Sequence, residues 1–377
     1  MKARRRWLQQ LLGAAAAAAC GTSVRAAPGD ARPPMHRGLN LTHWFEYDRS
    51  QVVRPAELRE LRSLGFDHVR LPLDPLACGW RVAEPARLPF AQDLQQTVEQ
   101  VLAAELTLVL DLHLEPSDKA SIEQAAQGRA AVVALWSALA RMVSQAPVPR
   151  LALELFNEPQ FHGSASPGWA PFQRQMLQAV REHAPAHTVL LTGHQGSSIE
   201  GLQRLKPLAD KAAAYVFHYY SPYLFTHQGA HWMETRYTTA GLHRDVRYPA
   251  SLQAGRPLQL SQPHPRAADE LQRYVAERWA AERIHRELSA AALWARTHGV
   301  PVVCNEFGVL RAAADPASRY RWIGDVRRSL ETLGIGWTLW DYAHIFGITE
   351  TSSTPPTSAP RRIEPLALAA LGRPGPG

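Results

Sequence analysis

The sequence predicts an α/β protein whose fold is a (β/α)8 barrel in a single domain. Along the 377 residues, eight short apolar segments typical of strands alternate with segments whose apolar residues recur at helical spacing. The strand candidates are nearly continuous apolar runs, which is typical of parallel strands covered by helices. Eight such units in succession favour a closed barrel over a doubly wound sheet, which usually has fewer strands.

The strand candidates follow one another at regular intervals. They are residues 37–41, 68–73, 106–113, 150–156, 188–192, 214–219, 301–305 and 336–340. Helices are predicted over residues 55–64, 94–104, 130–143, 172–183, 268–297 with room for a break, 316–333 and 362–371. No G-x-G-x-x-G follows the first strand and no G-x-x-x-x-G-K-[ST] occurs, so the sequence does not predict a nucleotide-binding sheet.

The barrel domain is predicted to span residues 35–371, with a short disordered tail at residues 372–377. The connection over residues 221–267 is much longer than the common range of roughly 2 to 6 residues. We expect it to form a wall or lid over the barrel mouth rather than a separate domain.

The first 26 residues are typical of a signal peptide. Lys2 and three consecutive arginines precede a short apolar stretch and six alanines, too short to span and anchor as an ordinary membrane helix. The arginines resemble a twin-arginine leader. The segment around Cys20 resembles a lipoprotein cleavage site, which makes a lipid anchor at Cys20 one alternative; cleavage after Ala26 or Ala27 is the other. We expect export to the periplasm or the cell exterior.

Charge and cysteine content argue against a nucleic-acid-binding protein and against a disulfide-rich protein. The formal charge is +7, but five basic residues and no acid lie in the first 26 positions, so the rest of the chain carries only +2. A nucleic-acid-binding protein would be expected to keep a basic face. Besides Cys20 only Cys78 and Cys304 are present, too few for a disulfide framework. Cys304 stands two residues before Glu306 and is expected to share its strand face.

Two glutamates each follow a short apolar run, Glu158 after the fourth strand candidate and Glu306 after the seventh. Glycosidic bond cleavage requires such a pair, because one carboxyl protonates the leaving oxygen while the other attacks or stabilises the sugar carbon. In a (β/α)8 barrel the functional side chains lie at the carboxyl ends of the strands. Other polar or aromatic residues at strand ends are Arg70, Asp111, His113, Asn157, His218, Tyr220 and Trp340.

These residues, in this order, resemble the glycoside hydrolases of family 5, retaining barrel glycosidases that include many cellulases. The resemblance covers roughly residues 37–371. Its most specific element is Phe156-Asn157-Glu158-Pro159, supported by Asn305-Glu306-Phe307-Gly308. Gln160 is not the usual residue after the proline, but it lies beyond the residues that would carry the chemistry.

The resemblance implies a role for each matching residue. Glu158 would be the general acid/base and Glu306 the nucleophile. Asn157 would hold the sugar 2-hydroxyl, and Arg70 and Tyr220 would donate hydrogen bonds to Glu306. The remaining matches would shape the sugar-binding position: His113 and His218 would line it, and Trp340 would form its stacking floor. The pKa of Glu158 is expected to be raised while Glu306 is ionised.

Two neighbouring acids, Asp111 and Glu154, are interpreted as hydrogen-bonding residues of the barrel rather than catalysts. The histidines show no H-E-x-x-H or other ligand spacing, so no metal or cofactor is expected and most of the 16 are interpreted as surface and loop residues. Candidate stacking platforms, each equally explained by loop packing, are Trp44, Phe45, Trp80, Tyr223 and Trp232.

The sequence therefore predicts an exported endo-β-1,4-glucanase that acts on a polysaccharide or oligosaccharide. Family 5 enzymes differ in substrate through their loops, so mannan, xyloglucan or a bacterial exopolysaccharide are alternatives. A non-catalytic glycan-binding protein of polysaccharide export is a rival, but such a protein would be expected to lack one of the glutamates. An esterase or peptidase is disfavoured because no G-x-S-x-G motif occurs.

Overall fold

The computed structural model describes residues 32–161, 168–233, 238–350 and 361–372. The predicted signal peptide, the lipidation candidate Cys20 and most of the predicted tail lie outside these residues. Within them, no helix is long and apolar enough to cross a membrane.

Eight parallel strands close into a barrel in chain order, which confirms the predicted (β/α)8 fold. The strands are β1 (Arg37–Asn40), β2 (His68–Leu73), β3 (Thr107–Leu112), β4 (Leu151–Glu154), β5 (Thr188–Thr192), β6 (Ala213–His218), β7 (Val302–Glu306) and β8 (Gly336–Leu339). All eight predicted strands are present, and their bounds differ from the predicted ones by at most two residues at either end.

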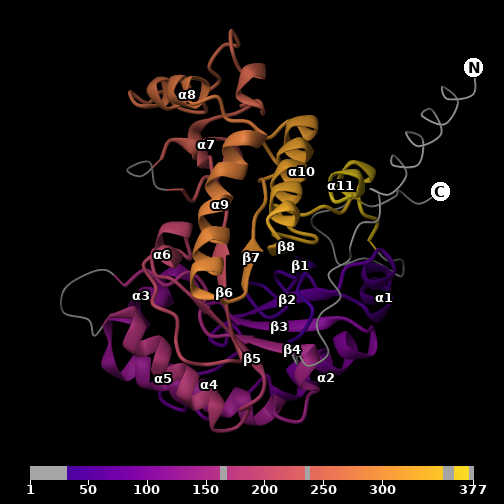
Figure 1. Cartoon of the computed structure of the whole chain (residues 1–377), viewed down its shortest axis with the longest axis vertical. Coiled ribbons are helices and arrows are strands. Elements are labelled where there is room, and N and C mark those ends of the chain that lie inside the picture. The colour runs from indigo at the N-terminus through magenta and orange to yellow at the C-terminus, as the bar shows by residue number, and fades with distance from the viewer. Residues whose placement is uncertain (1–31, 162–167, 234–237, 351–360, 373–377) are drawn as a thin grey trace, which may run out of the picture. The chain divides into compact units, whose positions relative to one another are not determined.

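Helices cover the outside of the strands (Figure 1). They are α1 (Pro55–Ser63), α2 (Ala91–Ala103), α3 (Pro116–Gln124), α4 (Ala126–Val143), α5 (Trp169–Arg181), α6 (Ile199–Gln203), α7 (Tyr223–Thr226), α8 (Ala267–Ala276), α9 (Ala281–His298), α10 (Pro316–Thr332) and α11 (Pro365–Ala370). Three short 3-10 helices are η1 (Val148–Arg150), η2 (Ala240–Leu242) and η3 (Ala250–Leu252). The predicted segment 268–297 is indeed two helices, whereas α3, α6 and α7 were not predicted.

The core has two apolar layers. The larger layer lies between the strands and the helices. The smaller one fills the barrel and consists of Met35, Val109, Ala152, Leu190, Ala214, Val216 and Val303. Gly38 allows a close approach inside the barrel, because a Cβ atom at that position would lie only 2.2 Å from the His68 ring. The apolar filling keeps the barrel rigid below the polar carboxyl ends of the strands.

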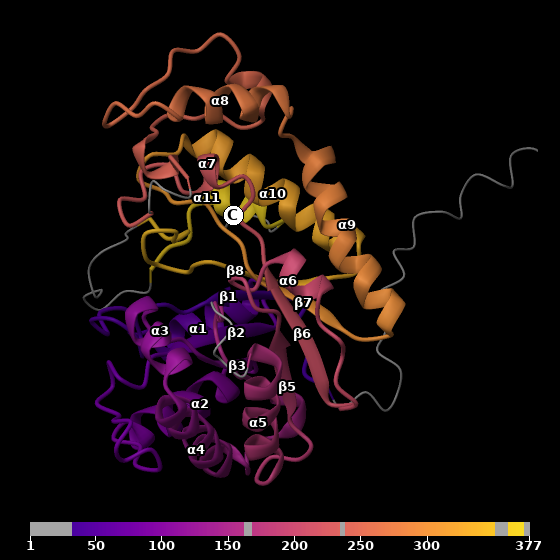
Figure 2. The ribbon, with the colours of Figure 1, turned by 90° about the vertical axis from the view of Figure 1, so that its left-hand side faces the viewer.

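The long connection after β6 carries α7, η2 and η3 and leads into α8. Both views place α8 far from the strands, with α7 between α8 and the barrel (Figures 1 and 2). Polar contacts fasten this connection to α10, because the hydroxyl of Tyr248 donates to Asp325 at 2.8 Å and Arg247 pairs with Asp315 at 2.6 Å. Its position over the barrel mouth as a wall or lid stays a prediction.

Candidate active site

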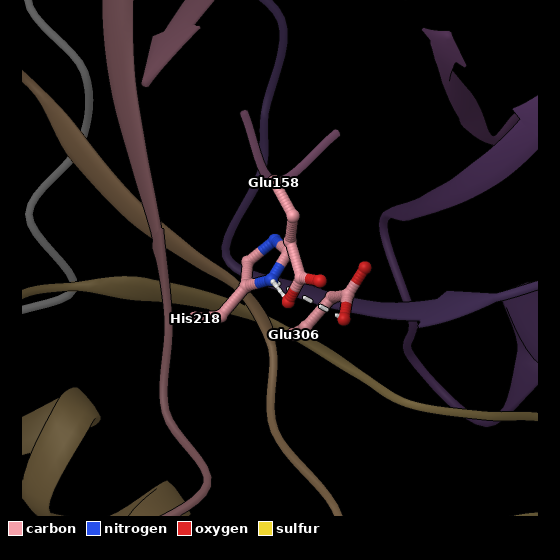
Figure 3. A group of neighbouring side chains, drawn as sticks. All are labelled: Glu158, His218 and Glu306. Carbon is pink, nitrogen blue, oxygen red and sulfur yellow. Dashed lines mark hydrogen bonds and ion pairs between the residues drawn. The ribbon is translucent and has the colours of Figure 1, made fainter. Parts of the chain in front are cut away.

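Glu158, His218 and Glu306 meet at the carboxyl end of the barrel (Figure 3). The Nδ1 atom of His218 lies 2.8 Å from Glu158 Oε1 and 3.3 Å from Glu306 Oε2. One ligand-type atom from each of the three side chains lies within 4.8 Å of the other two. The side chain of Glu306 is 5% exposed and that of Glu158 is 32% exposed. The two predicted glutamates are therefore neighbours that differ in access to solvent.

A bulge at the end of β7 turns Glu306 toward the barrel axis. Phe217 of β6 pairs with Cys304, but the next residue, His218, pairs with Glu306, so Asn305 is the extra residue. Bulges of this kind redirect side chains next to active sites. Cys304 packs in the outer apolar layer, whereas Glu306 bonds to Arg70 inside the barrel. The prediction that Cys304 shares the face of Glu306 is wrong, because the bulge interrupts the alternation.

Arg70, on β2, is fully buried and contacts residues on four other strands, β1, β3, β4 and β7. Its Nη1 atom donates to Glu306 Oε1 at 2.7 Å, and its Nε and Nη2 atoms donate to both oxygens of Glu154 at 2.7 and 2.9 Å. Its Nη2 atom also lies 2.8 Å from Asp111 Oδ2. Burial opposes the charge, but these carboxylates outweigh it and raise the pKa of Arg70. The guanidinium is thus a permanent cation that orients Glu306.

Asp111 and Glu154 contact Arg70 and lie in the wall of the site, as expected for hydrogen-bonding residues of the barrel. Burial raises the pKa of Asp111 to about 6, although Arg70 opposes the rise. Burial likewise raises the pKa of Glu154. Both carboxylates are held by donors from other strands of the barrel, which suits a structural part better than proton transfer to a ligand.

His113, Asn157 and Trp340 form one side of the site. The Nδ1 atom of His113 lies 2.8 Å from Asp111 Oδ2, and its Nε2 atom lies 3.1 Å from Asn157 Nδ2. Burial lowers the pKa of His113 to about 3, so its ring is neutral and its two nitrogens serve as one donor and one acceptor. The ring stacks on Trp340 with centroids 5.4 Å apart. Trp340 is therefore fixed beside the polar cluster.

Tyr220 and Arg70 contact different oxygens of the Glu306 carboxylate. The hydroxyl of Tyr220 donates to Glu306 Oε2 at 2.9 Å, whereas Arg70 contacts Oε1. Burial and the negative charge of Glu306 raise the pKa of Tyr220, so the hydroxyl keeps its proton. Glu306 thus has a donor on each oxygen.

The pKa of Glu158 differs from the expectation. Burial raises it, but the hydrogen bond and positive charge of His218 outweigh burial and hold the pKa of Glu158 at about 2. The pKa of His218 is raised in turn, because the carboxylates of Glu306 and Glu158 outweigh its burial. The expectation of a raised pKa for Glu158 considered Glu306 alone. These opposite shifts favour an ionised Glu158 beside a protonated His218, so the two groups titrate as a pair that shares one proton.

The same three side chains have the donor types of a metal site, two carboxylates and one imidazole. However, Arg70 occupies one oxygen of Glu306 at 2.7 Å and Tyr220 the other at 2.9 Å. A cation would have to compete with both donors and with the shared proton. Both oxygens of Glu306 therefore already have donors from the protein.

The histidines and loop aromatics include both buried and exposed residues. Five histidines among the described residues are buried and are exceptions to the interpretation of most as surface and loop residues; they are His68, His187, His218, His227 and His243. Of the candidate platforms, Trp44, Phe45 and Trp80 are buried packing residues. Tyr223 and Trp232 are 45% and 55% exposed, and they stay candidates for stacking on sugar.

Two asparagines support the site although no role was predicted for them. Asn305 donates to Glu154 Oε1 at 2.8 Å, and Asn40 accepts from Arg70 Nη1 at 2.9 Å. Asn40 is a polar residue at the end of an apolar strand, the same signal that identified the others. Lys119 contacts the backbone oxygen of Glu158 at 3.2 Å. No signal identified Lys119, because α3 itself was not predicted.

Two adjacent carboxylates at the carboxyl end of a (β/α)8 barrel, one of them bonded to a buried arginine, define a barrel glycoside hydrolase. Comparison with known families identifies the family of glycoside hydrolases. The chain matches the model of "Cellulase (glycosyl hydrolase family 5)" over residues 33–344, and it belongs to this family.

Individual relatives agree with this assignment. The chain is 28% identical to Endoglucanase 3 of Fibrobacter succinogenes over 84% of its length, although the match spans only half of that protein. It is 26% identical to Endoglucanase C of Acetivibrio thermocellus, covering 81% of this chain and 90% of the relative. The fold resembles Cel5A of Thermotoga maritima, solved with mannotriose, with a TM-score of 0.70, 23% identity and coverage of 89% and 97% of the two chains.

Proposed function

We propose that this protein is an endo-β-1,4-glucanase that cleaves its substrate with retention of configuration. The observation that carries the mechanism is the closeness of Glu158 and Glu306, whose nearest oxygens lie within 4.8 Å. Retaining enzymes place the two carboxyl groups about 5 to 5.5 Å apart, whereas inverting enzymes separate them by about 6.5 to 9.5 Å to admit a water molecule. The closeness of the two carboxylates supports the retaining arrangement.

In the first step, Glu306 attacks the anomeric carbon while the bond to the leaving sugar breaks. Arg70 and Tyr220 orient the attacking carboxylate through one bond to each oxygen. The proton shared by Glu158 and His218 passes through Glu158 to the leaving oxygen, because Glu158 is the more exposed member of the pair. This step forms a covalent glycosyl-enzyme and leaves Glu158 ionised and His218 neutral.

In the second step, a water molecule attacks the anomeric carbon and Glu306 leaves as a carboxylate. Glu158 accepts the proton of the water, and sharing it again with His218 restores the starting state. His218 gives up the proton in the first step because esterified Glu306 carries no charge, and it regains the proton in the second step because the freed Glu306 carboxylate stabilises the imidazolium again. Proton and charge balance over the cycle.

The remaining residues of the site suit sugar binding. Asn157 is buried beside Arg70 and His113, where its amide can reach the hydroxyl next to the reacting carbon. The Nε2 atom of His218 has no hydrogen-bond partner among the described residues, which leaves it available to a sugar hydroxyl. Trp340 is half-buried beside His113 and can stack on the sugar ring.

The choice of β-1,4-glucan rests on the family and on relatives named endoglucanases. Export to the periplasm or the cell exterior is part of the proposal and rests on the first 26 residues of the sequence. Mass spectrometry of the mature protein would test export and its form: a chain starting at lipidated Cys20 indicates an anchor, and one starting near Pro28 indicates conventional cleavage. An uncleaved chain in the cytoplasm would contradict export.

The function is tested by release of reducing ends from soluble β-1,4-glucan, mannan and xyloglucan, with Glu306→Ala as the inactive control. We expect the glucan to be cleaved fastest, with a rapid fall in viscosity that indicates internal cleavage. Proton NMR of the first products is expected to show the β-anomer, which marks retention. Faster cleavage of mannan or xyloglucan would overturn the substrate, and an α-anomer would overturn the mechanism.

A further inference from the structure

A pocket of about 210 Å³ opens beside Glu158. One face of α3 forms its first wall, through residues spaced as neighbours on a helix surface; they are Pro116, Lys119, Ala120, Glu123 and Gln124. The chain that follows β4 forms the second wall, through Glu158, Gln160 and Phe161. Pockets for drug-sized ligands measure roughly 300 to 1,000 Å³, so this one has room for about a single sugar ring.

Glu123 holds the two walls together. Glu123 is only 5% exposed. Its two carboxylate oxygens accept hydrogen bonds from the backbone N–H groups of Gln160 at 2.9 Å and Phe161 at 3.0 Å. Both oxygens of the carboxylate are therefore engaged in shaping the pocket. These two hydrogen bonds hold Gln160 and Phe161 in place even when no ligand is bound.

Lys119 is the second buried charge of the pocket, with only 6% of the residue exposed. Its Nζ atom donates to the backbone oxygen of Glu158 at 3.2 Å. No ion pair joins Lys119 to an acid among the residues that the structure describes, although buried lysines are usually paired. An ammonium has three donors, so a cation that lines a pocket with donors to spare favours a ligand rich in acceptors.

We propose that Lys119 binds a hydroxyl of the first sugar residue on the leaving-group side of the cleaved bond and determines specificity for that sugar. This inference rests on the proposed function, in which Glu158 protonates the leaving oxygen and the leaving sugar must lie against Glu158. The pocket is in contact with Glu158 and has the size of one ring. Phe161, half-buried in the same wall, supplies an aromatic surface for the ring.

The test compares two substrates whose leaving groups are both poor alcohols. Cellotetraose releases a shorter sugar as its leaving group. Methyl β-cellobioside can release methanol, which has no further hydroxyl for Lys119 to bind. In Lys119→Met we expect kcat/KM for cellotetraose to fall about ten- to a hundredfold, the effect of one charge-assisted hydrogen bond. Methanol release should change by less than about twofold, the scale expected where no bond is lost. The exposed Lys206→Met is the matched control.

Equal losses on the two substrates would overturn the inference, because Lys119 would then act only through Glu158 or the fold. No loss on either would overturn it as well. If Lys119→Met melts early, Lys119→Gln decides, because its amide can keep the bond to Glu158 with fewer donors; we expect a smaller loss, confined to cellotetraose. A wild-type protein inactive on cellotetraose would overturn the proposed function itself, a result distinct from an active wild type with equal losses.

Discussion

Glu306 and Glu158 face the same space, yet their surroundings differ. Glu306 is 5% exposed and has Arg70, Tyr220 and His218 within hydrogen-bond reach. Glu158 is 32% exposed, and its one side-chain partner among the described residues is His218. A carboxylate that attacks carbon must be fixed in direction, whereas one that moves protons needs access and a partner for exchange. The difference supports the proposed roles on physical grounds.

The largest effect that would test this comparison is loss of the attacking group. Glu306→Ala is expected to lower kcat on cellotetraose on the order of 10⁵-fold, because the variant removes the carboxylate that attacks the sugar carbon in the proposed mechanism. Added azide should restore turnover of an aryl cellobioside and give the α-glycosyl azide, since azide takes the place of the lost carboxylate. More than about 1% residual activity would mean that another group attacks.

Replacement of Glu158 is expected to cost less. Glu158→Ala should lower kcat/KM on cellotetraose by roughly 10²- to 10⁴-fold, the usual contribution of a positioned general acid. The first step on 2,4-dinitrophenyl β-cellobioside should be nearly unaffected, because that leaving group needs no proton. Burst kinetics measure this step separately. An equal loss on both substrates would assign Glu158 a part other than proton transfer.

A single donor to Glu306 comes next in size. In Tyr220→Phe the bond to Glu306 Oε2 is lost, and a bond to a charged group is worth about 1.5 to 3 kcal/mol, so kcat/KM should fall about 10- to 150-fold. Tyr219→Phe is the matched control, because that neighbouring hydroxyl donates to Glu287 instead. Similar losses in both variants would indicate damage to β6 rather than loss of the donor.

The smallest effect concerns pH. The pKa of His218 is raised above its ordinary value, so the shared proton is lost, and activity falls, only at pH above about 6.5. In His218→Asn the proton must reside on Glu158 alone, and a carboxyl loses it at lower pH than an imidazolium does. The alkaline limb of kcat/KM should therefore move to lower pH by about one unit or more. An unchanged limb would show that His218 does not hold the proton.

The sequence predicted the barrel, and the structure brings the expected residues of the site together. Both follow from one pattern, because an apolar run that ends in a polar residue is typical of a buried strand whose carboxyl end lies at the barrel mouth. The prediction missed α3, since the segment 116–124 has few apolar residues and buries Lys119 and Glu123 instead. Burial of charges depends on partners that are distant in the chain. Sequence periodicity contains no information about them.

The proton shared by Glu158 and His218 was also beyond prediction. The two residues are 60 positions apart, and their coupling depends on a distance of 2.8 Å. The bulge at Asn305 is a similar case, because it depends on how β7 pairs with β6. Residue identities were sufficient to find the site, whereas its protonation required the geometry.

Arg70 joins residues that are synthesised far apart in time. Asp111 and Glu154 belong to the first half of the chain, whereas Glu306 lies 236 positions after Arg70. A growing chain therefore holds the arginine and its two wall carboxylates long before the attacking group exists. Under the proposed roles, a chain that ends before β7 would lack the attacking carboxylate and could not cleave a glycan.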